Sequence, residues 1–287
     1  MRTRIALVGN APENKHELLN TLLADDTLTE MYDVSLYGAD GQPEADSLQD
    51  AIDDWHDGII DGIACLPLRE GLPEGMPIKI HATSRLAYVS KTRDITQESI
   101  VKRATALAKA LKRDLSILNP RIAILSLNSE IATGDDSAEI NIIAPAVSEL
   151  VKKRIQAFGP IANGKFFDTD DFMAFDAVLQ MREGQCDEAF ANVSNENFVT
   201  MFAEAEPAIT MAEPEELLKA LNLSADIARN RKVYDQPFDN PLPKLYHEKR
   251  EDGDKARFAV KKGFNPAEHR RENVTYIKEK NIKDTNS

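Results

Sequence analysis

Short apolar runs alternate along the chain with stretches in which apolar residues recur every three or four positions. Continuous runs predict buried β-strands over residues 4–8, 33–38, 58–67, 86–90, 121–127 and 175–181. The recurring spacing predicts helices with one buried face. The clearest stripe comprises Ile100, Ala104, Leu107, Ala108, Leu111 and Leu115. Strands that alternate with helices form parallel β-α-β units, so the pattern predicts an α/β fold.

Other segments complete this pattern. The spacing of Leu48, Ala51, Ile52 and Trp55 places them on one face of a helix. Further helices are expected over residues 13–24 and 214–232, the latter ending before the turn signal at 240–244. A helical pattern over 139–154 contains Pro145, which lacks a backbone N–H and should interrupt it.

Composition is that of a soluble globular protein, with 287 residues, 42% of them hydrophobic and 29% charged. No apolar run approaches the length of a membrane span. The first residues turn polar too soon for a secretory signal. We therefore expect a cytoplasmic protein with no membrane partner.

The net charge of −13 argues against nucleic acid as a general partner. Residues 246–287 differ from the rest, with 11 Lys and Arg against 8 Asp and Glu. This basic polar C-terminal tail is predicted either to be solvated or to dock on the acidic body.

Common site signatures fail. One glycine follows the first strand where a dinucleotide fingerprint needs three, and neither a P-loop nor a GxSxG motif occurs. The histidines are scattered and predict surface or capping roles rather than a metal site: His16, His56, His81, His247 and His269. Cys65 and Cys186 predict ordinary buried or half-buried thiols.

Two acidic clusters remain, at residues 134–139 and 166–172. Carboxylates gathered in this way bind hard cations in some proteins. They also favour the positive end of a helix dipole. The first cluster precedes a predicted helix, so capping is the favoured interpretation there.

Five segments in order resemble the 4-hydroxythreonine-4-phosphate dehydrogenase (PdxA) family. They are LAYVSKTRDI (86–95), SLNSEIATG (126–134), IIAPAV (142–147), GPIANGKFF (159–167) and FDAVLQMREGQC (175–186). The family counterparts are VALVTTHIPL, GLNPHAGE, IIPAI, GP-x-x-AD and YDAVLAMYHDQG. The opening RIALVGNAPENKHELL (4–19) and residues 225–244 resemble the two ends of family members.

The resemblance implies an isopropylmalate-dehydrogenase-like fold of two α/β/α domains with a cleft between them. Residues 1–80 and 205–245 would build the first domain, and residues 81–204 the second, which also forms the dimer. The tail after them would be 246–287. The family forms homodimers whose active site lies in the cleft and is completed by the partner subunit.

The resemblance also implies a chemistry, and this sequence departs from it. Family members act in pyridoxal phosphate biosynthesis, oxidising a phosphorylated hydroxy-amino acid with NAD(P) before decarboxylation. Three histidines hold their metal, and Thr92, Glu130 and Glu183 stand in those places here. A substrate-contacting lysine aligns with Ala191. Threonine is a poor divalent ligand, so the inherited zinc-type mechanism is not expected.

Three hypotheses follow. The favoured one is a non-catalytic binding or regulatory protein, able to pair with an active PdxA paralogue. The second is a re-tooled NAD(P)-dependent enzyme with a carboxylate site for Mg²⁺ or Mn²⁺, built from Glu130, Glu183 and Asp187. The third is a working family member. The other candidate cleft residues are Asn128, Lys91, Arg93 and Arg182.

Overall fold

The computed structural model describes part of the chain. The described residues are 2–9, 30–38, 43–68, 70–80, 87–89, 95–128, 137–162, 166–167, 171–182, 184–186 and 198–236. They belong to one compact unit that spans residues 1–236. The predicted helix at 13–24 and the tail at 246–287 lie outside the described residues.

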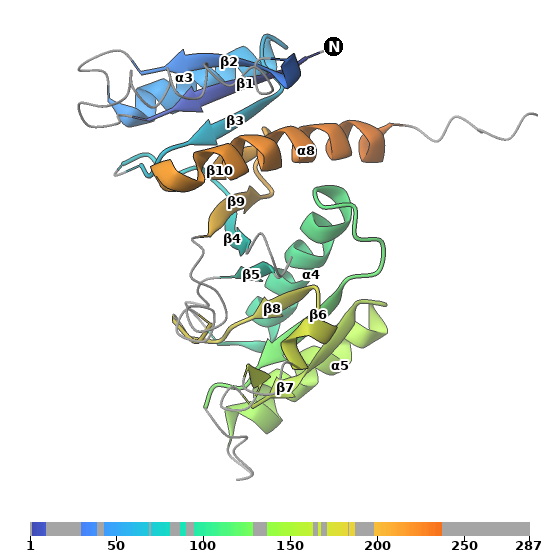
Figure 1. The fold of residues 1–287 in the computed structure, drawn as a ribbon. Coiled ribbons are helices and arrows are strands. Elements are labelled where there is room, and N and C mark those ends of the chain that lie inside the picture. The colour runs from blue at the N-terminus through green and yellow to red at the C-terminus, as the bar shows by residue number, and fades with distance from the viewer. Residues whose placement is uncertain are drawn as a thin grey trace, which may run out of the picture. The chain divides into compact units, whose positions relative to one another are not determined.

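Strands of the described chain join in a ten-stranded sheet, in the order β2-β1-β3-β10-β9-β4-β5-β8-β6-β7 (Figure 1). The strands of one end are β1 (Thr3–Val8), β2 (Tyr32–Tyr37), β3 (Gly62–Cys65) and β10 (Ile209–Met211). Those of the other end are β5 (Ala87–Val89), β6 (Arg121–Leu125), β7 (Gln156–Ile161) and β8 (Ala177–Leu179). Strands β4 (Met76–Ile80) and β9 (Val199–Ala203) lie between them.

We call β2-β1-β3-β10 the first half-sheet and β5-β8-β6-β7 the second half-sheet. Every pair within each half-sheet is parallel, as the sequence predicts. The pairs that join them through β9 and β4 are antiparallel, which the sequence did not predict. The first half-sheet draws on both ends of the described chain. The domain boundaries near residues 80 and 205 stay predictions.

Helices follow the apolar spacing closely. They are α3 (Glu44–His56), α4 (Gln97–Arg113), α5 (Ala144–Lys152) and α8 (Leu217–Asp235). Shorter turns are a π-helical segment at Glu139–Ile143 and 3-10 turns at Asp171–Ala174 and Pro214–Glu216. The predicted interruption at Pro145 is wrong, because the chain stays helical through this residue. The π segment changes to α5 at Ala144, and Pro145 is tolerated because it lies in the first turn of α5, where its missing N–H is least needed. None of the described helices is long and apolar enough to cross a membrane.

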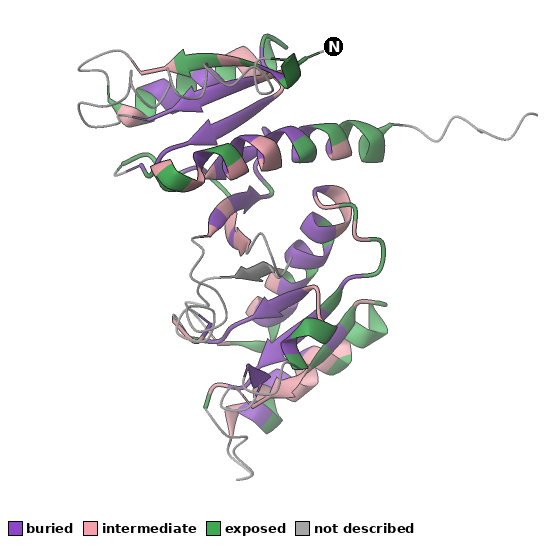
Figure 2. Ribbon diagram, viewed as in Figure 1, coloured by how far each residue is buried: buried purple, intermediate pink, exposed green. Residues whose placement is uncertain are grey.

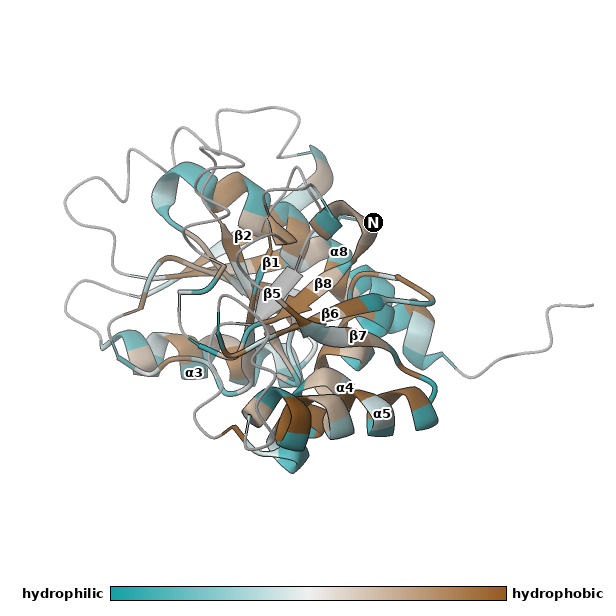
Figure 3. Ribbon diagram, turned by 90° about the horizontal axis from the view of Figure 1, so that it is seen from below, coloured by the Kyte–Doolittle hydropathy of each residue, from teal (hydrophilic) through white to brown (hydrophobic). Residues whose placement is uncertain are grey.

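Side chains of the strands alternate between two apolar cores. In β1, Ile5 and Leu7 pack with α8, whereas Ala6 and Val8 pack with α3. In β6, Ile122 and Ile124 join the core of α4 and α5. Ala123 and Leu125 point to the other face and pack in a cluster of phenylalanines. Both faces are therefore buried, which explains why these strands are continuous apolar runs (Figures 2 and 3).

The two cysteines lie in the cores of different half-sheets. Cys65 ends β3, and Cys186 packs in the phenylalanine cluster behind β6 and β8. Both are fully buried and neither forms a disulfide, which confirms the prediction of buried thiols. Burial raises the pKa of the Cys65 thiol to about 12.

Candidate functional site

Strands β6 and β8 are parallel neighbours, so their carboxyl ends lie at the same edge of the sheet. Asn128 follows β6 and Arg182 follows β8. The Arg182 guanidinium donates from Nη2 to the Asn128 Oδ1 across 3.2 Å. Two residues that are 54 positions apart thus meet at the edge where α/β proteins usually place their ligands.

Asn128 lies between Arg182 and a buried carboxylate. Its Nδ2 donates to Glu139 Oε1 at 3.1 Å. Glu139 is 1% exposed and opens the π segment. A carboxylate only accepts hydrogen bonds, so Glu139 requires the amide nitrogen to face it. The amide oxygen then faces the guanidinium, which only donates.

Gln185 holds the two loops together. Its Oε1 accepts from the backbone N–H groups of Met181 at 2.6 Å and Arg182 at 2.8 Å. Its Nε2 donates to the Ser126 carbonyl at 2.9 Å. The Ser126 hydroxyl in turn donates to the carbonyl of Asn128. The backbone that carries Arg182 is therefore fixed against the end of β6.

Of the predicted site residues, the structure describes Asn128 and Arg182 and brings them together. The others lie outside the described residues: Lys91, Thr92, Arg93, Glu130, Glu183 and Asp187. Sequence reasoning missed Glu139 and Gln185. Glu139 belonged to a cluster interpreted as a helix cap, yet its carboxylate binds Asn128. Gln185 could have been found from the sequence, because it follows the predicted strand that became β8 and so belongs to the same edge as Arg182.

The described groups at this edge do not fit a divalent cation. Arg182 places a positive charge there, and the Asn128 oxygen that would serve as a ligand already accepts from it. Within the described ranges, no three His, Cys, Asp or Glu side chains gather closely enough to hold a metal. The residues that the family motif would assign to a metal lie outside these ranges.

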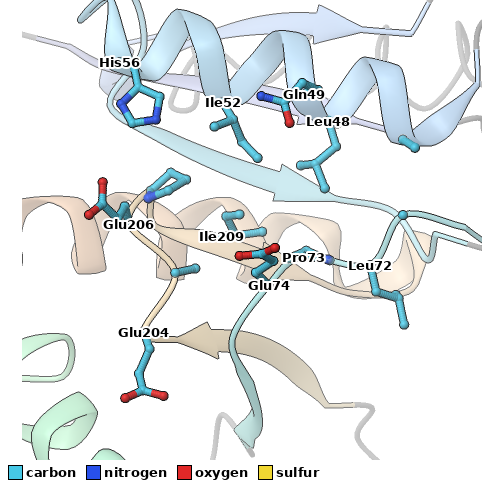
Figure 4. Close-up of a pocket in the computed structure, with 14 residues that line it drawn as sticks. Leu48, Gln49, Ile52, His56, Leu72, Pro73, Glu74, Glu204, Glu206 and Ile209 are labelled. Atoms are coloured by element: carbon cyan, nitrogen blue, oxygen red, sulfur yellow. The ribbon is translucent and has the colours of Figure 1, made fainter.

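Figure 4 shows a separate cavity of about 480 Å³ beside α3. Its floor is apolar, with Leu48 and Ile52 of α3 facing Ile209 of β10. His56 and Glu206 are also among the residues that line it. His56 is exposed and ends α3, as expected of a surface histidine. Of the two predicted site residues that the structure describes, neither Asn128 nor Arg182 lines this cavity.

A second cavity of about 550 Å³ lies between α4, α8 and the turn that joins β9 to β10. A buried ion pair forms one wall. Arg231 contacts Asp114 through two bonds of 2.7 and 2.9 Å. It also donates to the carbonyls of Ala205 and Glu206, both at 2.8 Å. These bonds use four of the five N–H groups of the guanidinium, so we interpret Arg231 as a structural residue.

Comparison with known proteins is consistent with the site's position. The family model of the pyridoxal phosphate biosynthetic protein PdxA matches residues 74–202, which include β6 and β8. A 4-hydroxythreonine-4-phosphate dehydrogenase of Bacteroides thetaiotaomicron is 28% identical over 262 residues, covering 76% of this chain and 72% of the relative. A Caulobacter vibrioides protein of the same name is 36% identical over 93 residues, covering 32% of this chain and 28% of the relative.

Solved structures share the fold. A 4-hydroxythreonine-4-phosphate dehydrogenase from Burkholderia phymatum superimposes with a TM-score of 0.58 at 15% identity, over 81% of this chain and 97% of that one. At this identity the likeness shows the α/β fold alone. The matched family segment, the long Bacteroides alignment and the shared fold agree, and together they show that the chain is similar to the PdxA family.

Proposed function

We propose that this PdxA-like protein binds a small molecule at the carboxyl ends of β6 and β8 without oxidising it by the zinc-type mechanism. The observation that carries the proposal is the bonded set of Arg182, Asn128 and Glu139 at that edge. A fixed cation there opposes a divalent metal by charge repulsion. The sequence adds support, because Thr92, Glu130 and Glu183 stand where the family motif has histidines.

The relatives are named for 4-hydroxythreonine 4-phosphate, so this compound is the first to test. We would measure NADH or NADPH formation by absorbance, with Zn²⁺, Mg²⁺ and Mn²⁺ supplied in turn. The Bacteroides relative serves as the positive control. We expect no turnover above the protein-free rate, while the compound raises the melting temperature of the protein. Sustained turnover would contradict the proposal.

A re-tooled dehydrogenase is the alternative, with Glu130 and Glu183 as oxygen ligands for Mg²⁺ or Mn²⁺. Calorimetric titration of metal-stripped protein separates it from the first proposal. Metal binding that disappears in Glu130→Ala/Glu183→Ala would favour the alternative. Equal weak binding by wild type and variant would favour the non-catalytic role.

A further inference from the structure

We propose that the ligand of this site carries a carboxylate or phosphate group, and that Arg182 binds this group without a metal ion. The inference rests on the proposed function and names the chemistry of its ligand. It also gives Glu139 a role as a positioning residue that acts through Asn128. Both residues belong to the bonded set at the ends of β6 and β8.

The Arg182 side chain has donors to spare. A guanidinium carries five N–H groups. One bond, to Asn128 Oδ1, accounts for its side-chain hydrogen bonding among the described residues. The residue is exposed, so the remaining donors are open to a ligand. Planar, paired donors match the two oxygens of a carboxylate or phosphate, and such bonds are stronger than those between neutral groups.

The charge of Arg182 is not cancelled by an ion pair among the described side chains. Glu139 carries the nearby carboxylate, but Asn128 stands between the two and bonds to each. The guanidinium is therefore held by a neutral amide and keeps its attraction for an anion. A direct Arg–Glu pair would have neutralised it.

Glu139 fixes which way the amide faces. If Asn128 were rotated, its NH₂ group would face the guanidinium, and two donors would oppose each other. The buried Glu139 carboxylate excludes that orientation because it needs a donor. Gln185 fixes the main chain of Arg182, because its Oε1 accepts a hydrogen bond from the Arg182 backbone N–H. The guanidinium is thus positioned from both its side chain and its main chain.

Calorimetry in EDTA tests the ligand class, with inorganic phosphate and malonate as separate probes. We expect saturable binding of at least one probe, weakened about tenfold or more in Arg182→Gln and less in Arg182→Lys. Arg154→Gln is the matched control, because Arg154 is exposed and follows α5, outside the bonded set. A preference between the probes identifies the anionic group. Equal affinity in wild type and Arg182→Gln, or no binding of either probe at millimolar concentration, overturns the proposal.

A double-mutant cycle tests the positioning role. Glu139→Leu, which removes the acceptor for the Asn128 amide, should weaken probe binding when introduced into the wild type. It should add nothing in the Asn128→Ala background, because its effect passes through that amide. Additive losses would contradict the role and indicate general damage.

The dehydrogenase assay separates this inference from the proposed function. Turnover combined with Arg182-dependent anion binding would refute only the non-catalytic role. Absent turnover combined with absent anion binding would refute only the ligand class.

Discussion

At the scale of single residues, Asp61 shows how local hydrogen bonds determine the pKa of a carboxylate. Its carboxylate accepts from the backbone and side chain of Arg4 and from Lys232 Nζ at 2.6 Å. Burial alone would raise its pKa, but these hydrogen bonds outweigh burial and lower the pKa to about 2. The group joins β1, the start of β3 and α8.

This pKa predicts a pH dependence of stability. Because the folded-state pKa lies below the ordinary value of 3.8, Asp61 stabilises the fold fully above about pH 4, and the stabilisation is lost as the pH falls towards about 2. Asp61→Asn should melt a few degrees below wild type at pH 7, with the gap narrowing between pH 4 and 2. Thermal melts at each pH measure this. The exposed Asp57→Asn serves as control, and a gap of constant size would contradict the prediction.

The same scale shows what the sequence reveals about the site. Asn128 and Arg182 were predictable as cleft residues because each follows an apolar run that had to be a buried strand. Their contact was not predictable, since it depends on the register of β6 and β8. The role of Glu139 was hidden because an acidic residue before a helix is equally typical of a cap.

At the scale of elements, the Asp114–Arg231 pair joins α4 to α8 and to the turn after β9. Side-chain exposure is 3% for Asp114 and 8% for Arg231. Removing one partner leaves the other charge buried without compensation.

Arg231→Met should therefore lower the free energy of unfolding by about 3–5 kcal/mol. The double variant Asp114→Leu/Arg231→Met should recover part of this loss, because no lone charge remains. Arg229→Met on the same helix is the control, since its ion pair with Asp226 is exposed, and it should cost less than about 1 kcal/mol. Urea titration measures all three. Equal stability of Arg231→Met and wild type would contradict the structural role.

Gly62 allows α8 to approach β3. A Cβ at this position would lie 2.5 Å from Ser224 Oγ. Gly62→Ala should cost about 1–3 kcal/mol by overpacking. Adding Ser224→Ala removes the clashing oxygen, so the double variant should be more stable than the sum of the single effects predicts. Strict additivity in denaturant titrations would show that the helix adjusts by another route.

Elements also show where sequence reasoning failed. Strands β4, β7, β9 and β10 were missed. Strand β10 has three residues, too few for a period to appear. Strand β7 contains Gly159 and Pro160, which resemble a turn but are tolerated here because β7 is an edge strand. Strands β4 and β9 depend on each other across more than a hundred residues. The longer helices among the described residues were predicted, as were strands β1, β2, β3, β5, β6 and β8.

At the scale of the whole molecule, the continuous sheet favours cooperative unfolding. Trp55, the one tryptophan of the chain, lies in α3 over the first half-sheet. Its fluorescence and far-UV circular dichroism should show the same melting midpoint, and Gly62→Ala should lower both together. An earlier fluorescence transition would mean that the first half-sheet unfolds by itself.

Assembly is also tested at this scale. From the family, we propose a homodimer, so light scattering should give about twice the chain mass of 31.9 kDa. Co-purification with an active paralogue tests the regulatory role. A concentration-independent monomer would contradict the dimer.

The buried thiols give each half-sheet its own reporter. Cys65 belongs to the first and Cys186 to the second, and neither is exposed. A thiol reagent can reach either one only while the surrounding core is open. The modification rates of the two cysteines, measured separately by mass spectrometry, would therefore report how often the core of each half-sheet opens in the wild-type protein. Because both native cysteines are buried, a cysteine introduced at the surface could be labelled selectively in the folded protein.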